Sequence, residues 1–317
     1  MKRDQLTIFD SQAVRAGLSY PDCIRVVRDA MKALSAGTTR QLLRAMIPLS
    51  PGRAFGHMTG ALGEQDMFGA KMLSVFADPH APTHRRHRGV VILFEPDQGE
   101  PVAIADAEEI TYIRTAAASA VATAALARAD ASTLLIVGTG GQARTHLTAL
   151  PLVHQFKRVL VWGRSAAKAQ ALVDEFAALG AELAPHLRTA AQQADVICTL
   201  TGSAEPILLG EWIRPGTHLN LIGSSGAGPV EVDSALVAKS RYIADSRASA
   251  LAAAAEFLIA RDAGLIGDDH IVAEIGDVLL GRIPGRRSAD EITIYKSLGH
   301  VVQDLAATAH LYRSSLA

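Results

Sequence analysis

Three small residues at fixed spacing, Gly138, Gly140 and Ala143, form the most informative chemical pattern in the sequence. A β-rich run, Thr133–Val137, precedes them and a helical stretch follows to about Leu152, which is the context that gives such a motif meaning. Gly138 allows a tight turn, Gly140 allows the backbone to approach a pyrophosphate, and Ala143 allows the helix to pack closely on the strand. We predict a dinucleotide site at this loop; the alternative is a glycine turn without a nucleotide. The predicted contacts are Gly138, Thr139, Gly140, Gly141, Gln142 and Ala143.

The end of the second predicted strand, Arg158–Trp162, indicates which dinucleotide binds. NAD-specific sites usually carry an acid there that binds the ribose, but this chain has Arg164 and Ser165, with Lys168 one helical turn later. A guanidinium beside a hydroxyl suits a 2′-phosphate. We therefore expect NADPH to be preferred, with NADH as the alternative; a solvated Arg164 is the competing interpretation.

Three cations, Arg44, Lys71 and Arg114, occur on predicted strands or at element ends in the first part of the chain. Cations inside apolar segments are costly unless they are paired. Spacing alone does not bring these three together, and a cation in such a position is more often a surface residue or half of an ion pair. The basic run His84–Arg88 can likewise be a solvated loop or a site for a second carboxylate.

The elements before residue 130 predict an α+β lobe with a largely antiparallel sheet. Apolar residues recur at helical spacing from Pro21 to Ala36, and Gly37 is a stop signal. The apparent strands are Leu42–Leu49, Phe68–Phe76 and Val90–Glu95, with a hairpin signal at 96–99 and a loop at Ser50–Met58. An alanine-rich helix, Thr115–Arg128, leads out of this lobe.

From Ser132 onward, strands alternate with helices in the rhythm of a doubly wound parallel sheet. The later helices are expected at Ala166–Leu179, Ala248–Ala263 and Ile292–Leu316, the last returning to the first lobe. The strands are expected at Thr133–Val137, Arg158–Trp162, Asp195–Leu200, His218–Ile222 and Arg241–Ala244. The fold class is therefore α/β, with a Rossmann-type sheet inserted in a second, α+β domain.

Composition limits the classes of partner. The 317 residues are long enough for two lobes, are 49% hydrophobic and 20% charged, and contain no apolar run of membrane-spanning length. A formal charge of −1 and 5% aromatic residues argue against nucleic acid as a partner. Cys23 and Cys198 lack metal-ligand spacing, so no metal is expected, and the first ten residues lack a signal-peptide core. We expect a cytoplasmic protein.

Five segments occur together and in order: Phe68–Lys71, Arg114–Ala117, Gly138–Ala143, Glu205–Leu208 and Tyr295–Gly299. Together they resemble the ornithine cyclodeaminase/μ-crystallin family over nearly the whole chain. The resemblance implies a homodimer with a substrate and dimerisation domain formed by residues 1–123 and 292–317. It also implies an inserted NAD(P)-binding domain, residues 124–291.

The same resemblance implies residue roles. The positions matching Arg44, Lys71 and Arg114 hold a substrate carboxylate, and His87 matches a position near the nicotinamide, although a core or surface histidine is the simpler interpretation. Met58 is expected near the substrate. Further cofactor contacts are expected at Thr199, Thr201, Ile222 and Lys296.

One departure from the family pattern bears on the reaction. Cyclodeaminases and related alanine dehydrogenases carry an Asp after the strand His218–Ile222, whereas Ser225 stands there in this chain, and Asp233 belongs to the start of the next helix. Ketimine-reducing μ-crystallins also lack the acid. The resemblance therefore implies reduction of a small 2-imino acid, such as 1-pyrroline-2-carboxylate or 1-piperideine-2-carboxylate, with Lys71, Arg114 and Ser225 at the reacting centre. The alternatives are ornithine cyclodeamination, reduction of an open-chain imine such as iminosuccinate, and a non-enzymatic NADPH-dependent ligand carrier.

Overall fold

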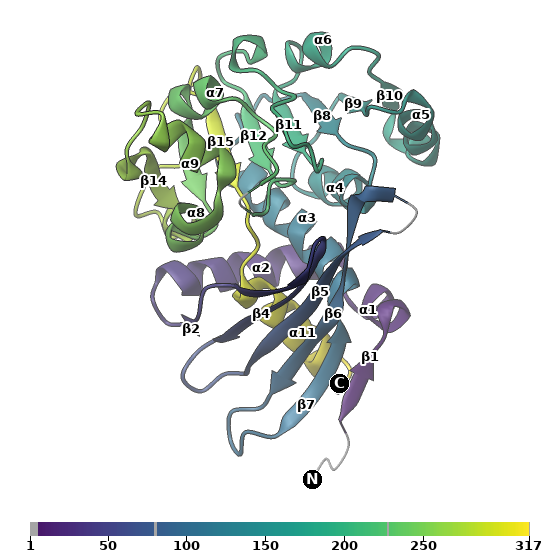
Figure 1. Ribbon diagram of the computed structural model, residues 1–317, viewed down its shortest axis with the longest axis vertical. Coiled ribbons are helices and arrows are strands. Elements are labelled where there is room, and N and C mark those ends of the chain that lie inside the picture. The colour runs from purple at the N-terminus through teal and green to yellow at the C-terminus, as the bar shows by residue number, and fades with distance from the viewer. Residues whose placement is uncertain (1–5, 79–80, 227, 317) are drawn as a thin grey trace. The chain divides into compact units, whose positions relative to one another are not determined.

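The computed structural model describes residues 6–78, 81–226 and 228–316, with the side chains of 77–87 outside the description. The chain forms two compact units, each shown in Figure 1. The first unit comprises Met1–Thr115 and Gly299–Ala317, and the second comprises Ala116–Leu298. The boundaries expected from the sequence, after residues 123 and 291, lie eight residues after the first division and seven residues before the second.

The first unit is a sheet with helices packed on it. Its helices are α1 (Ser11–Gly17), α2 (Tyr20–Ser35), α11 (Val301–Ser314) and the first part of α3 (Ala107–Leu126). Its strands are β1 (Thr7–Phe9), β2 (Arg40–Gln41), β3 (Ala45–Ser50), β4 (Arg53–Ala61), β5 (Phe68–Asp78), β6 (Ala81–Phe94) and β7 (Pro101–Asp106). The order is β1-β7-β6-β5-β4-β2, with β3 paired to β4. Only the β1–β7 pairing among these described strands is parallel, so the predicted antiparallel α+β lobe is confirmed.

Residues alternate between the two faces of this sheet, as they do along any strand. The inner face carries buried side chains such as Met58, Lys71, Leu73 and Val91. Helix α11, yellow in Figure 1, packs against β4, β5 and β6 and also against α2. Residues of α11 and of the inner face are thereby brought into contact although they are more than 200 positions apart in the sequence.

Two predictions for this unit are wrong. The strand expected at Leu42–Leu49 begins only at Ala45, as β3, and the separate strand β2 lies before it at Arg40–Gln41. The first apolar residue of the expected strand is not sheet core, since Leu42 is 68% exposed. The loop expected at Ser50–Met58 is largely β4. Its glycines obscured the strand, and Gly56 packs closely against Met46, whose sulfur would lie 2.4 Å from a Cβ at that position.

The helix expected from Thr115 begins earlier, at Ala107, and continues to Leu126 as α3. Arg114 is consequently in the interior of a helix, not at an element end as the sequence suggested. None of the helices in the described ranges is both long and apolar enough to cross a membrane.

The second unit is an eight-stranded parallel sheet flanked by helices (Figure 1). Its strands are β8 (Thr133–Val137), β9 (Arg158–Trp162), β10 (Ala181–Leu183), β11 (Val196–Thr199), β12 (His218–Leu221), β13 (Arg241–Ala244), β14 (Ile271–Glu274) and β15 (Thr293–Lys296). Its helices, besides the rest of α3, are α4 (Gly141–Ala149), α5 (Ala166–Glu175), α6 (Leu187–Ala191), α7 (Ser234–Lys239), α8 (Arg247–Ala253), α9 (Ala255–Asp262) and α10 (Ile275–Leu279). Short 3-10 helices are η1 (Leu150–Leu152), η2 (Ala177–Leu179), η3 (Gly210–Trp212) and η4 (Asp268–His270).

The strand order β10-β9-β8-β11-β12-β15-β13-β14 confirms the predicted doubly wound topology. From β8 the chain moves outward to β9 and β10, then returns to β11 on the other side of β8. In such sheets ligands bind at the carboxyl ends of the strands, where the strand order reverses. The loop after β8 therefore occupies the expected position for a ligand site.

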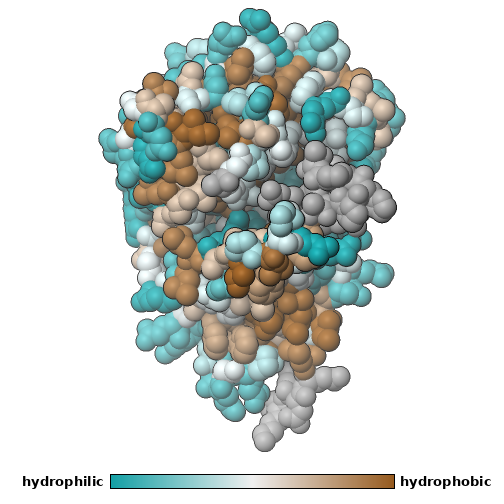
Figure 2. Space-filling model, in the orientation of Figure 1, coloured by the Kyte–Doolittle hydropathy of each residue, from teal (hydrophilic) through white to brown (hydrophobic). Residues whose placement is uncertain are grey.

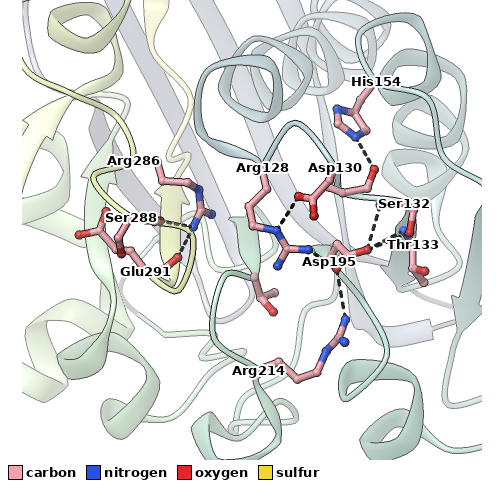
Figure 3. A network of polar contacts seen from close by, with 12 residues as sticks. Arg128, Asp130, Ser132, Thr133, His154, Asp195, Arg214, Arg286, Ser288 and Glu291 are labelled. Atoms are coloured by element: carbon pink, nitrogen blue, oxygen red, sulfur yellow. Dashed lines mark hydrogen bonds and ion pairs between the residues drawn. The ribbon is translucent and has the colours of Figure 1, made fainter.

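A polar network fixes the opposite, amino-terminal edge of this sheet (Figure 3). Asp195, which immediately precedes β11, accepts hydrogen bonds from the backbone N–H groups of Ser132 and Thr133 at 2.9 and 3.0 Å. The guanidinium groups of Arg128 and Arg214 donate to its other oxygen at 3.0 and 3.2 Å. These contacts hold the starts of β8 and β11 together and lie away from the expected ligand edge.

Two helix predictions in the later part of the chain are also wrong. Ile292–Leu316 is not one helix: its beginning is β15, in the middle of the parallel sheet, and α11 starts only after Gly299, whose φ is +78°. All four residues of β15 are buried, so they show no alternation between a buried and an exposed face, and periodicity does not distinguish such a strand from a buried helix. Ala248–Ala263 is interrupted at Ala254, a fully buried residue with extended backbone that separates α8 from α9.

Candidate functional site

A buried charge cluster in the first unit centres on Asp304, a residue that no sequence motif singled out. The ammonium of Lys71 and the Nε of Arg114 each lie 2.9 Å from the same carboxylate oxygen, Oδ1. The exposed fraction is 5% for Lys71, 4% for Arg114 and 0% for Asp304. Strand β5, helix α3 and helix α11 thus each contribute one member of an interior ion triad.

Local structure explains how these side chains meet. Lys71 points to the inner face of the sheet, opposite Met58 of β4 in the strand register, and α11 lies on that face. Gly299 turns the chain into α11 and packs against the guanidinium of Arg114: a Cβ there would lie 2.8 Å from its nitrogens. Its positive φ and this close approach both require glycine.

Further groups complete the cluster. Thr111 Oγ1 accepts a hydrogen bond from Lys71 at 2.5 Å, and Gln303 Oε1 accepts one from Arg114 at 3.0 Å. Arg44, between β2 and β3, donates to the carbonyl of Gly299 at 3.5 Å. The structure therefore brings together the three cations Arg44, Lys71 and Arg114. A polar pair, Gln303 and Asp304, within the apolar stretch Val301–Leu305 was the available sequence signal for the missed partners.

The electrostatics of the triad favour an additional anion. Two cations share one carboxylate, so the triad carries one positive charge in excess when all three groups are ionised. Burial lowers the pKa of Lys71 to about 8, with Arg114 adding to the decrease and Asp304 opposing it. Burial raises the pKa of Asp304, but the charges of Arg114 and Lys71 outweigh it and hold that pKa below its ordinary value.

Two other residues, Met58 and His87, were expected near the substrate, and the structure describes the side chain of only the first. Met58 is buried beside Lys71 in the inner face of the sheet. The side chain of His87, on β6, lies outside the described residues. A histidine that was not singled out, His300, caps α11 through Nδ1, and burial lowers its pKa to about 4, so it is neutral near pH 7.

The glycine-rich loop in the second unit has the geometry that a pyrophosphate needs. Gly138 follows β8 with a φ of +136°, and a Cβ there would lie 2.8 Å from the carbonyl oxygen of Leu200. Gly140 begins α4 without a side-chain cap, and no described atom lies within 4 Å of where its Cβ would stand. Ala143 is fully buried. Uncapped N–H groups beneath open space fit a bound phosphate.

The remaining predicted cofactor residues border this loop. Arg164, Ser165 and Lys168 follow β9 and are exposed, and Ser165 caps α5 by accepting from the Lys168 N–H at 3.4 Å. A Cβ on Gly163 would lie 2.5 Å from the Thr139 methyl carbon, so the end of β9 directly contacts the glycine-rich loop.

Residues after β11, β12 and β15 complete the carboxyl edge of the sheet. Thr199, Thr201 and Ile222 lie at the ends of β11 and β12, whereas Lys296, at the end of β15, is completely buried and ion-paired with Glu256 at 2.7 Å. Ser225 is exposed on the loop after β12. Asp233 caps α7 by accepting from the Leu236 N–H at 3.0 Å, which confirms the helix-start role expected for it.

Comparison with known proteins agrees with this geometry. A Δ1-pyrroline-2-carboxylate reductase of Paracoccus denitrificans is 34% identical over 307 residues, covering 93% of this chain and 96% of that protein. A ketimine reductase mu-crystallin of Mus musculus is 33% identical, covering 88% and 86%. The structure of Thermococcus litoralis Δ1-pyrroline-2-carboxylate reductase in complex with NADH and L-proline superposes with a TM-score of 0.93 at 29% identity, covering 98% of each chain. The ornithine cyclodeaminase/mu-crystallin family model matches residues 6–317, and the chain belongs to that family.

Proposed function

We propose that this protein is an NAD(P)H-dependent reductase of small 2-imino acids, with cyclic ketimines such as 1-pyrroline-2-carboxylate and 1-piperideine-2-carboxylate as substrates and an L-amino acid such as proline as product. The observation that carries the proposal is the buried triad of Lys71, Arg114 and Asp304. The names of the two curated relatives and the proline-bound neighbour support the same substrate class. We assign substrate binding to the first unit and dinucleotide binding to the second.

The triad supplies what a carboxylate substrate requires. Lys71 and Arg114 together carry two positive charges, and Asp304 compensates one of them. A substrate carboxylate would compensate the other, and a guanidinium can bind it with paired N–H donors. Arg44, at the edge of the cluster, provides a second guanidinium. These residues fix the orientation of the imino acid, which is a large part of catalysis when the substrate is already electrophilic.

Lys71 is the proton source in this proposal. A bound NAD(P)H supplies the hydride that adds to the C=N carbon. The imine nitrogen takes a proton from the Lys71 ammonium. The neutral Lys71 amine then regains a proton from solvent, so one hydride and one proton are consumed in each turnover. A lysine with a pKa of about 8 is protonated at neutral pH but gives up its proton more readily than an ordinary lysine.

Ser225 replaces the acid that cyclodeaminases carry after β12. A hydroxyl can hydrogen-bond to the substrate nitrogen but cannot act as a carboxylate base at neutral pH. Reduction of a preformed imine does not need such a base, whereas oxidation of a protonated amine does. Ser225 therefore favours imine reduction over ornithine cyclodeamination.

We propose NADPH as the preferred cofactor. Arg164 and Lys168 are exposed beside Ser165 after β9, where they can contact a 2′-phosphate, and no carboxylate is present at residues 163–168 to bind the ribose hydroxyls instead. The glycine-rich loop itself serves NADPH and NADH equally.

We also propose a homodimer that covers the outer face of the first unit's sheet. An antiparallel sheet with one solvated face usually has polar residues there. Here a cross-strand row of Ile8, Ile104, Ile92 and Ala70 lies on that face, and Ile8 is 71% exposed. Phe68 and Phe94 stack at 5.3 Å beside the row. In Figure 2, brown apolar side chains gather on the visible surface of this unit, as expected for an uncovered interface.

The cysteines suit a reducing compartment. Cys23 and Cys198 are both free and buried. We therefore propose that the enzyme works in the cytoplasm, where thiols remain reduced.

The decisive assay follows NADPH and NADH oxidation with 1-pyrroline-2-carboxylate, 1-piperideine-2-carboxylate and iminosuccinate, in parallel with ornithine and catalytic NAD+. We expect oxidation with the cyclic imines and no proline from ornithine. Proline and ammonia from ornithine would replace the proposal with a cyclodeaminase. Turnover with iminosuccinate alone would indicate an open-chain imine reductase, and NADPH binding without turnover would indicate a ligand carrier.

A further inference from the structure

Glu231 is a buried carboxylate that receives four hydrogen bonds from three residues in two segments of the second unit. Its Oε1 accepts from the backbone N–H and the hydroxyl of Thr201, at 2.6 and 2.8 Å. Its Oε2 accepts from the hydroxyl of Thr199 and the backbone N–H of Gly223, both at 2.8 Å. The exposed fraction of Glu231 is 1%, so water does not replace these donors. One side chain thus joins the segments that follow β11 and β12.

A second buried network holds the next residue of the same loop. The Ser224 hydroxyl donates to Glu256 at 2.9 Å, and Lys296 donates to the carbonyl and hydroxyl oxygens of Ser224 at 2.5 and 2.6 Å. Lys296 and Glu256 are ion-paired, with exposed fractions of 0% and 1%. The loop that carries Ser225 is therefore fixed at two consecutive residues by two different carboxylates.

Close backbone packing connects this loop to the glycine-rich loop. A Cβ on Gly223 would lie 1.9 Å from the carbonyl oxygen of Thr201, so the two backbones are in direct contact there. Leu200, one residue earlier, packs in the same way against Gly138. A displacement of Gly223 would therefore be transmitted to Thr201 and from there to the turn at Gly138.

We propose that Glu231 is a positioning residue that holds the Gly223–Ser225 loop against Thr201 for catalysis, and that Lys296 acts with Glu256 as a second clamp on Ser224 instead of contacting the cofactor. This inference rests on the proposed reductase function and names residues that set the geometry of its reacting centre. Neither Glu231 nor Glu256 is assigned a contact with the substrate; each acts through the loop that carries Ser225.

The contacts of Glu231 need an acceptor at each carboxyl oxygen. Burial raises the pKa of Glu231, and the hydrogen bonds from Thr201 and Thr199 oppose that increase by stabilising the carboxylate. The two backbone donors, Thr201 N–H and Gly223 N–H, point at different oxygens of Glu231. An ionised carboxylate accepts at both oxygens, but a glutamine has one oxygen and one NH2 group. Whichever way a glutamine is turned, one of these fixed N–H groups faces another donor and loses its partner. Glu231→Gln therefore removes one anchor of the loop with almost no change in volume.

Hydrogen exchange tests the positioning role without any need for turnover. We compare wild type with Glu231→Gln and with Glu211→Gln, an exposed glutamate of the same unit, in the presence of NADPH. We expect at least tenfold faster exchange in peptides covering 199–203 and 222–226 of Glu231→Gln, and wild-type exchange in Glu211→Gln. Unchanged exchange in both peptides would overturn the inference. Equally faster exchange in β13 would also overturn it, because Glu231 would then stabilise the whole unit.

Ser224→Ala tests the second clamp and serves if Glu231→Gln does not fold. It removes the hydroxyl between Lys296 and Glu256, so we expect faster exchange at 222–226 with 199–203 unchanged. Exchange at 222–226 that remains as in wild type would refute this clamp.

Kinetics separate positioning from cofactor binding. For Glu231→Gln we expect kcat of imine reduction to fall more than tenfold, while the Kd of NADPH, measured by titration calorimetry, changes less than threefold. A Kd that weakens as much as kcat falls would assign Glu231 to cofactor binding instead. If wild type reduces no imine, the proposed function fails, but the exchange and binding results still decide the role of Glu231 in the loop.

Discussion

The ammonium of Lys71 lies 2.9 Å from the carboxylate of Asp304, and both side chains are buried. Arg114 approaches the same oxygen at the same distance. The carboxylate is thus the common anchor of two cations that sequence position separates by more than 40 residues. Its charge keeps Lys71 protonated in spite of burial, and its position fixes where both cations present their remaining donors.

Removing the Lys71 ammonium should abolish most of the activity. For Lys71→Met we expect kcat/KM for the preferred cyclic imine to fall by about 100-fold or more, the usual effect of losing a positioned acid. Lys157→Met, which removes an exposed lysine, is the matched control and should behave as wild type. Arg114→Ala should show a comparable loss through weaker carboxylate binding. Wild-type kcat/KM in both Lys71→Met and Arg114→Ala on every imine the parent reduces would refute the assignment.

The pKa of Lys71 predicts the alkaline limb of the pH profile. Its value of about 8 lies below the ordinary 10.5 because burial disfavours the ammonium. The protonated form is the active one, so kcat/KM should decrease as pH rises through about 8, with a slope of one proton. Asp304→Asn removes the attraction that opposes this shift, so its alkaline limb should move to lower pH. A limb that stays at the same pH in Asp304→Asn would exclude Lys71 as the titrating group.

Buried histidines predict sensitivity to acid. Burial lowers the pKa of His218 from 6.5 to about 3, so the native state stays unprotonated over a range where the unfolded chain binds a proton. The free energy of unfolding should therefore fall as pH decreases from about 6.5 towards 3, by about 1.4 kcal/mol per pH unit for this residue. In urea titrations, His218→Gln should show a shallower dependence on pH than wild type. His186→Gln removes an exposed histidine and should leave the slope unchanged; an equal slope in all three proteins would contradict the prediction.

Arg164 should decide the choice between the two nicotinamide cofactors. For Arg164→Ala we expect the Kd of NADPH to weaken by roughly tenfold, about the 1 to 2 kcal/mol of a charge-assisted hydrogen bond at an exposed site. The Kd of NADH should change less than twofold. Arg188→Ala, in an exposed position on α6, is the control. Equally weaker binding of NADPH and NADH would indicate that Arg164 contacts a part of the dinucleotide that both cofactors share.

The outer face of the first sheet should control assembly. Ile8→Lys places a charge in the cross-strand isoleucine row, so we expect a monomer by light scattering where wild type is a dimer. Because Ile8 is already largely exposed, the monomer should remain folded by circular dichroism. Ile259→Lys, at a 50% exposed position on α9, should remain dimeric. A dimeric Ile8→Lys protein would locate the interface elsewhere.

The sequence alone was sufficient to predict features whose residues lie close together in the chain. The spacing of Gly138, Gly140 and Ala143 is meaningful because a strand, a tight turn and a helix must occur in that order, all within about 20 residues. The strands Thr133–Val137, Arg158–Trp162 and Arg241–Ala244 were located to the residue, since short β-rich runs between breakers have few other interpretations. The cations Arg44, Lys71 and Arg114 were identified by resemblance, but nothing in their spacing showed that they meet.

Only the tertiary structure decided what lies opposite those cations. Asp304 stands more than 180 residues from Arg114, and its helix was expected to include residues that form β15 instead. Periodicity cannot separate a strand buried on both faces from a buried helix, so the sequence did not show where α11 begins. The partners of Glu231 and Lys296 could not be predicted from the sequence either. A buried charge is stabilised by groups that folding brings together from several strands, and strand order and register decide which groups these are. Local sequence thus determined the glycine-rich loop between β8 and α4, and long-range packing determined which buried charges meet.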